Sequence, residues 1–220
     1  MYFSTKAANY FLNLKTPDKI LKGINIINPY ESREVRKIVK EFLTKFYSDN
    51  KERLFMIGIN PGRFGGGLTG ISFTDPVALR EYCGIQNNLG SKTELSSKYI
   101  YEMIAAFGGA EKFFSKVFMT ALFPLALTNN GKNFNYYDDK KLFDSLKSEI
   151  KKSLETQILF GSKKEKVVIL GKKNAEYFRL INDGLKFFGK IIVLDHPRFI
   201  MQYRQRSMKD YVNSYIRAIN

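Results

Sequence analysis

The chain has 220 residues, with 36 lysines and arginines against 21 aspartates and glutamates, and therefore a formal net charge of +15 at pH 7. This length suffices for a domain with a full hydrophobic core, and the charge favours a polyanionic partner, nucleic acid before an anionic membrane surface. One cysteine and one histidine exclude a disulfide framework, a four-cysteine cluster or zinc site, and a histidine-rich metal centre.

Two helices are predicted before the first strand. Residues 3–15 carry apolar side chains at roughly helical spacing, and Pro17 ends that segment. Residues 31–48 form the clearest early helix, with Ser32 as its expected N-cap and an apolar stripe that we assign to the core.

A glycine-rich loop follows the first predicted strand, residues 54–59. The chain turns at Asn60-Pro61-Gly62 and then reaches Phe73 through a segment rich in glycine. Glycine lets the backbone approach a ligand closely. The loop glycines are Gly62, Gly65, Gly66, Gly67 and Gly70.

Three interpretations of this loop compete. It is a flexible surface turn, a dinucleotide site, or a base-binding pocket that opens toward a nucleic-acid backbone. Gly65-x-Gly67-x-x-Gly70 fits the dinucleotide pattern, but that pattern begins at the strand end and opens a helix. Here the next helix start is Asp75-Pro76, so the dinucleotide site is disfavoured.

The rest of the chain alternates between helices and strands. The predicted helices are 75–82, 94–107, 138–159, 173–182 and 205–219; the strands are 116–122, 166–170 and 190–194; and 128–135 is predicted as a polar loop.

This order predicts an α/β fold, with a central four-stranded parallel sheet between two helical layers. We expect a single domain over residues 1–220, since no linker or repeat interrupts the pattern. Ligands of such sheets bind beyond the carboxyl ends of the strands. Asn60 and His196 both follow strands, so they are expected to converge there.

The residues at these strand ends resemble the motifs of a known family. Gly58-Ile59-Asn60-Pro61-Gly62, with Phe73 at the matching distance, resembles the first motif of the uracil-DNA glycosylase superfamily, most closely its single-strand-selective monofunctional branch. Further matches are a middle segment, residues 122–125 and 131–133, and the start of the second motif, His196-Pro197. The resemblance covers residues 54–205.

Two departures from the family pattern indicate a divergent subfamily. The family asparagine that reads the edge of uracil is Ala121 here, and Asn133 or Asn129 is a candidate to replace it. The family's His-Pro-Ser-Pro becomes His-Pro-Arg198-Phe199. Both changes bear on base selectivity.

The resemblance implies hydrolysis of the bond between a damaged base and deoxyribose, after the base leaves the stack. Asn60 would orient the attacking water, His196 would donate a hydrogen bond to the base, and Phe73 would stack on it. Gly62 would leave room that bulkier residues fill in stricter relatives. The remaining substrate-binding candidates are Gly58, Ile59, Ala121 and Asn133, and the DNA-binding candidates are Arg63, Ser72, Arg198, Phe199, Tyr203, Arg204 and Arg206.

Residues 198–206 are also the expected wedge that enters the vacated duplex, with Phe199, Met201 or Tyr203 as the inserted group. DNA is the expected partner, with no metal, no cofactor and a monomeric state. Without a secretory leader or a long apolar span, a cytoplasmic location and no membrane partner are expected. The rival interpretation is a non-catalytic nucleic-acid-binding module of the same fold.

Overall fold

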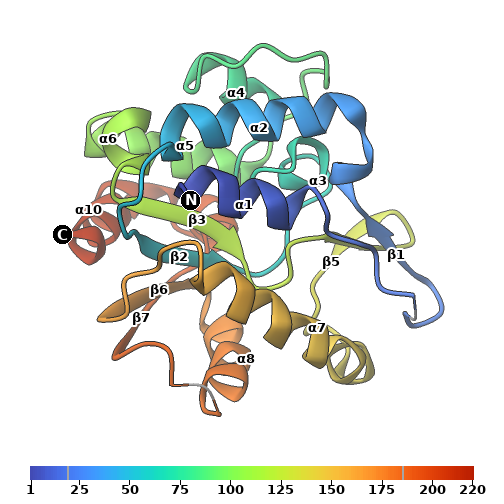
Figure 1. The fold of residues 1–220 in the computed structure, drawn as a ribbon. Helices are drawn as coiled ribbons and strands as arrows, with labels where there is room; N and C mark the ends of the chain where they lie inside the picture. Colours follow the sequence, from blue (N-terminus) through green and yellow to red (C-terminus); the bar gives the residue numbers. More distant parts are fainter. Residues whose placement is uncertain (19, 185) are drawn as a thin grey trace.

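Four parallel strands form the centre of the fold (Figure 1). The computed structural model describes residues 1–18, 20–184 and 186–220. In the order β3-β2-β6-β7, the strands are β3 (Val117–Ala121), β2 (Leu54–Gly58), β6 (Lys166–Leu170) and β7 (Lys190–Leu194). Every residue of β2 and β3 is buried, as expected where helices cover both faces of a sheet. The predicted four-stranded parallel sheet is confirmed.

Helices lie on both faces of this sheet. In Figure 1, α7 and α8 lie below it and α2, α4 and α5 lie above it. The helices are α1 (Phe3–Phe11), α2 (Arg33–Tyr47), α3 (Gly66–Thr69), α4 (Pro76–Glu81), α5 (Leu95–Phe107), α6 (Ala110–Phe114), α7 (Lys140–Ile158), α8 (Lys172–Asn182), α9 (Pro197–Tyr203) and α10 (Met208–Ile219), with 3-10 turns at Pro29–Glu31 and Gln205–Ser207. The predicted three-layer architecture is confirmed.

Side-chain caps fix several helix starts. Ser32 accepts a hydrogen bond from the Val35 N–H, and Asp75 accepts one from the Ala78 N–H at 2.8 Å, which satisfies amides that the first helical turn leaves free. The long helix begins at Lys140, two residues later than predicted. Its cap is Asp139, because the Asp138 carboxylate accepts the Asn135 N–H instead.

A second, antiparallel sheet of three strands lies beside the first: β1 (Ile24–Ile27), β4 (Ala126–Asn129) and β5 (Lys132–Phe134). The prediction of a polar loop over 128–135 is therefore wrong. The missed signal is Asn130-Gly131, where both residues have positive φ, as a two-residue hairpin turn requires. The pairing of β4 with β1 depends on a distant segment and is invisible to local periodicity.

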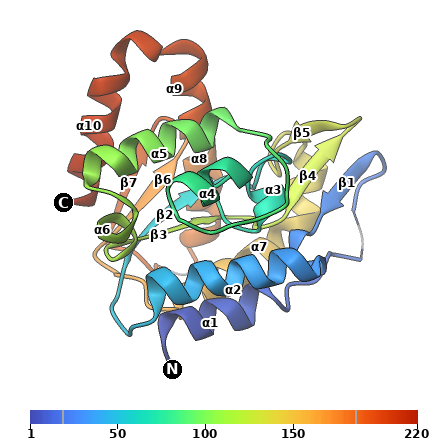
Figure 2. The ribbon, with the colours of Figure 1, turned by 90° about the horizontal axis from the view of Figure 1, so that it is seen from above.

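The C-terminal region also differs from the prediction. Instead of one helix over 205–219, the chain forms α9, a short 3-10 turn and then α10 (Figure 2). Pro197 opens α9 at its first helical position, where a missing N–H costs nothing.

The carboxyl ends of the parallel strands are in register. Gly58 pairs with Ala121, and Leu170 pairs with Leu194. After β2 the chain forms β3 on one side of β2, and later it forms β6 on the opposite side of β2. The direction in which strands are added to the sheet therefore reverses at β2. Ligand sites in such sheets lie at this switch point, where the glycine-rich loop begins.

Candidate active site

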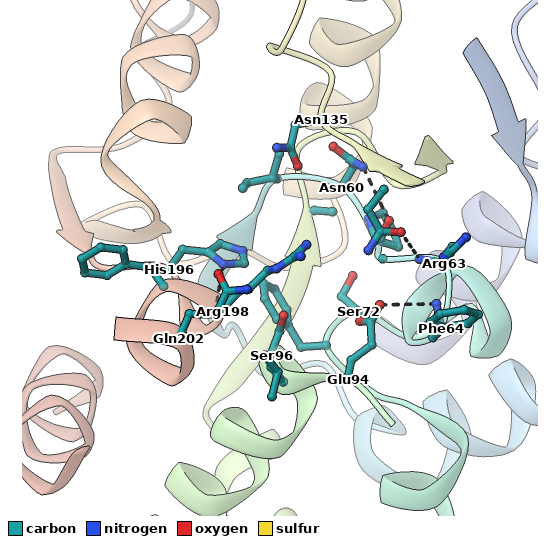
Figure 3. Close-up of a pocket in the computed structure, with 18 of the residues that line it drawn as sticks. Asn60, Arg63, Phe64, Ser72, Glu94, Ser96, Asn135, His196, Arg198 and Gln202 are labelled. Carbon is teal, nitrogen blue, oxygen red and sulfur yellow. Dashed lines mark hydrogen bonds between the residues drawn. The ribbon is translucent and has the colours of Figure 1, made fainter. Parts of the chain in front are cut away.

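A cavity of about 710 Å³ opens at this edge of the sheet (Figure 3). Its lining brings together most of the residues that the sequence singled out. These are Ile59, Asn60, Gly62, Arg63, Ser72, Phe73, Ala121, Asn133, His196, Arg198, Phe199 and Tyr203. The ends of β2, β3 and β7 and the hairpin β4–β5 therefore share one cavity.

The side chain of Asn60 is held by backbone groups at the end of β5 and just after it. Its Nδ2 donates to the Phe134 carbonyl at 3.0 Å, and its Oδ1 accepts from the Tyr136 N–H at 3.2 Å. Only one orientation of the amide satisfies both partners. Because a carbonyl oxygen has two lone pairs, Oδ1 retains one acceptor site, and a water in the cavity can donate to it.

His196 is both a lining residue and the N-cap of α9. Its Nδ1 accepts from the Arg198 N–H at 3.2 Å, so Nδ1 carries no proton and Nε2–H is the donor of the neutral ring. Burial, and then the Arg198 guanidinium, lower the pKa of His196 to about 4. At neutral pH this residue is therefore a neutral hydrogen-bond donor.

The ring of Phe73 occupies the space that the missing side chain of Gly58 leaves. A Cβ at Gly58 would lie 2.4 Å from Phe73 Cζ. The Phe73 ring centroid is 5.8 Å from that of His196. Gly58 itself does not line the cavity; it acts on the cavity through Phe73.

The room beside Gly62 is already filled. A Cβ at Gly62 would lie 2.0 Å from Glu94 Oε1, and one at Gly65 would lie 2.3 Å from Oε2. Oε1 accepts from the Phe64 N–H at 3.3 Å. Burial is the main cause that raises the pKa of Glu94. The expectation that Gly62 leaves free room is therefore wrong, since a carboxyl group from the start of α5 fills it.

The sequence motifs agree with two comparisons. A sequence profile described as the uracil DNA glycosylase superfamily matches residues 44–220. The chain belongs to the uracil DNA glycosylase superfamily. The crystal structure of wild-type SMUG2 from Pedobacter heparinus is similar to it with a TM-score of 0.95 and 40% sequence identity, covering 99% of this chain and 97% of that chain. No curated protein sequence matches the chain significantly.

In this superfamily member the charged side chains that line the cavity are mainly basic. Arg63, Lys132 and Arg198 line it against one acid, Glu94. Arg63 is also tied to the small sheet, because its N–H donates to Asn133 Oδ1 at 3.0 Å. The basic lining suits a polyanionic ligand.

The rim formed by α9 carries two exposed aromatic rings. Tyr203 is 65% exposed and Phe199 is 37% exposed, and their ring centroids are 5.5 Å apart. Met201 is buried, so it cannot be an inserted group without unfolding α9. Two predicted DNA contacts, Arg204 and Arg206, do not line the cavity; Arg204 packs over Phe199 instead.

Sequence reasoning missed several lining residues. Glu94 is the first residue of the predicted helix 94–107 and belongs to no motif, and Asn135 follows a strand, β5, that was not predicted. The other missed lining residues are Pro61, Phe64, Thr93, Leu95, Ser96, Lys132, Tyr137 and Gln202. Asn129, a candidate replacement for the family asparagine, is not among the lining residues.

Two kinds of feature are absent from the described residues. No cluster of three or more histidine, cysteine, aspartate or glutamate residues within 1–18, 20–184 and 186–220 is arranged to hold a metal ion. In the same part of this superfamily member, no helix combines the length and apolarity needed to span a membrane.

Proposed function

We propose that this chain is a monofunctional DNA glycosylase that hydrolyses the N-glycosidic bond of uracil, or of another deaminated base, rotated out of DNA. This reaction would initiate base excision repair. The observation that carries the proposal is that Asn60 and His196, from the ends of β2 and β7, line one cavity beside the ring of Phe73. Membership of the superfamily and the similarity to a protein titled SMUG2 support it.

The flipped base is held by stacking and by one directional hydrogen bond. Its face lies on the Phe73 ring, and the His196 Nε2–H donates to a base carbonyl. A neutral donor suits this role, because negative charge grows on that oxygen as the bond breaks, and a preorganised donor stabilises the charge without reorganisation. The Arg198 N–H on Nδ1 keeps the ring in the required tautomer.

The attacking water is oriented by Asn60. The free lone pair of Oδ1 accepts one water hydrogen and directs the water oxygen toward C1′ of the sugar. The C1′–N bond breaks with its electron pair going to the base, the water supplies the hydroxyl on C1′, and its remaining proton goes to the base or to solvent. An amide has no useful basicity, so Asn60 acts by positioning.

The DNA backbone is bound at the basic rim. Arg63, Ser72 and Arg198 lie where the phosphates beside the flipped nucleotide would pass, and Phe199 and Tyr203 would contact the duplex that the base has left. Arg63 keeps this place because Asn133 holds the glycine-rich loop against β5.

The test is an oligonucleotide that contains one uracil, incubated with the protein and then treated with alkali to cleave abasic sites. Strand scission is expected only after alkali. Scission without alkali would contradict a monofunctional reaction and implicate the exposed lining residue Lys132. Binding without scission on uracil, hypoxanthine or xanthine would favour a non-catalytic module. Full activity of Asn60→Ala and His196→Ala would refute the assignment of the site.

A further inference from the structure

The two partners of the Asn60 amide lie on a part of the chain that is not paired with the central sheet. Nδ2 donates to the Phe134 carbonyl at the end of β5, and Oδ1 accepts from the Tyr136 N–H, whereas Asn60 itself follows β2. Within the described residues, β1-β4-β5 and β3-β2-β6-β7 are separate sheets with no strand pairing between them. The orientation of Asn60 therefore depends on what holds the segment after β5 against β2.

A buried side-chain hydrogen bond links that segment to the core. The Tyr136 hydroxyl donates to Asn174 Oδ1 at 2.6 Å. Burial raises the pKa of Tyr136 well above its ordinary value, so the phenol keeps its proton and remains a donor at neutral pH. Asn174 lies in the first turn of α8, and both side chains are fully buried. The bond therefore joins two groups shielded from solvent, where the loss of a partner is costly.

Asn174 connects this phenol to the central sheet. Its Nδ2 donates to the Ile57 carbonyl in β2 at 3.3 Å and to the Leu170 carbonyl at the end of β6 at 3.2 Å. Because both amide hydrogens are used on carbonyls, Oδ1 faces the phenol and the orientation of the amide is fixed. Ile57 lies three residues before Asn60. The contacts therefore close a ring, from Asn60 through Tyr136 and Asn174 and back along β2.

We propose that Tyr136 and Asn174 are positioning residues that hold the Asn60 amide in the orientation that directs the attacking water. This inference rests on the proposed function. Neither side chain is among the described residues that line the cavity, so both act through the Tyr136 N–H and its bond to Asn60 Oδ1. Loss of the bond between them lets the segment after β5 shift. A small error in the direction of the water then lowers the rate of the chemical step, while the affinity for DNA is unchanged.

Tyr136→Phe tests the bond directly, because it removes the hydroxyl and keeps the ring, which packs edge-on against Tyr137 at 5.1 Å. In single-turnover assays on a uracil oligonucleotide, its maximal rate is expected to be about tenfold lower than that of wild type. The enzyme concentration at half-maximal rate should change by less than about twofold. Asn174→Ala removes the other half of the bond and should lower the maximal rate by at least as much.

Tyr47→Phe is the matched control. Tyr47 is also buried, and its hydroxyl donates to the Val117 carbonyl at 3.2 Å, at the opposite end of the central sheet from the cavity. This variant likewise leaves a buried acceptor without its donor, so it should lose a similar amount of stability. Its maximal rate should equal that of wild type, because Tyr47 has no connection to Asn60.

Two further measurements test whether the effect acts through Asn60. In an Asn60→Ala background, Tyr136→Phe should change the residual rate by less than about twofold, because the group that it positions is absent. Amide hydrogen exchange needs no activity. The Tyr136 N–H is bonded to Asn60 Oδ1, so exchange at residue 136 should be at least about tenfold faster in Tyr136→Phe and in Asn174→Ala than in wild type, and unchanged in Tyr47→Phe.

The outcomes distinguish this inference from the proposed function. With an active wild type, an unchanged rate in Tyr136→Phe, an equal loss in Tyr47→Phe, or the same tenfold loss in the Asn60→Ala background would overturn the positioning role alone. A wild type that releases none of the deaminated bases would overturn the proposed function, and exchange at residue 136 would still decide whether Tyr136 and Asn174 hold Asn60. Tyr136→Phe carries the test if Asn174→Ala does not fold.

Discussion

The ring of Phe73 packs against the Gly58 backbone so closely that a Cβ at residue 58 would lie 2.5 Å or less from two of its ring carbons. Phe73 also has a φ of 57°, in the left-handed region, which costs an L-residue about 1–2 kcal/mol. The packing must compensate for this strain. A glycine at the end of β2 and a strained residue after the loop thus set one aromatic face of the cavity.

Gly58→Ala should therefore displace the Phe73 ring. We expect the single-turnover rate on a uracil oligonucleotide to fall by about tenfold or more, because a small misplacement of a positioning group is costly. Gly184→Ala is the matched control, since a Cβ there meets no atom within 4 Å. Unchanged activity of Gly58→Ala would show that the ring position is not critical.

His196→Asn and His196→Ala separate the two roles of the imidazole. Asparagine is a good N-cap, so His196→Asn should keep most of the stability of α9, whereas His196→Ala should lose about 1 kcal/mol more. Both variants lack the Nε2–H donor and should be slower than wild type by about 100-fold or more. The measurements are chemical denaturation and single-turnover assays. Retained activity in His196→Asn would contradict the donor role.

The lowered pKa of His196 predicts a pH dependence of stability. The native state holds the ring neutral down to about pH 4, while the unfolded chain protonates near its usual pKa of about 6.5. The unfolded state therefore binds more protons between these values, and the free energy of unfolding falls as the pH drops through this window. His196→Gln should flatten that part of the curve. An identical slope in the variant would refute the assignment.

Glu94→Gln tests the buried carboxyl beside Gly62. The pKa of Glu94 is raised in the native state. At pH values just above the usual pKa of a glutamate, the native state therefore binds more protons than the unfolded state. The free energy of unfolding consequently falls as the pH rises and the carboxyl ionises. Glutamine retains an oxygen for the Phe64 N–H and carries no charge. At pH 7 the melting temperature of Glu94→Gln should be about 2 °C higher than that of the wild type, and at pH 4 the difference should be smaller. Glu94→Ala, which loses the hydrogen bond as well, should be less stable than Glu94→Gln at both pH values.

Tyr203→Ala should weaken DNA binding, because this exposed ring lies on the cavity rim. A stacking aromatic is worth about 1–3 kcal/mol per base, so the dissociation constant for a uracil oligonucleotide should rise by about tenfold. Leu159→Ala, which removes an exposed apolar side chain that is not a lining residue, is the control. Equal affinities would remove Tyr203 from the interface.

Local sequence determined the elements that carry the chemistry. Neighbouring residues suffice to predict the apolar run 54–59, the turn at Asn60-Pro61-Gly62 and the caps Ser32 and Asp75, because strands, turns and caps depend on short-range backbone preferences. The alternation of elements then fixed the class of sheet, and that class places Asn60 and His196 at one edge.

Only the tertiary structure decided what fills the cavity and which atoms face it. The Glu94 carboxyl beside Gly62, the Phe134 and Tyr136 groups that orient Asn60, and the pairing of β1 with β4 all join segments far apart in the chain. Such contacts form between side chains and backbone groups that meet only after folding, so no local pattern encodes them. The tautomer of His196 likewise follows from a helix start that the sequence analysis did not predict.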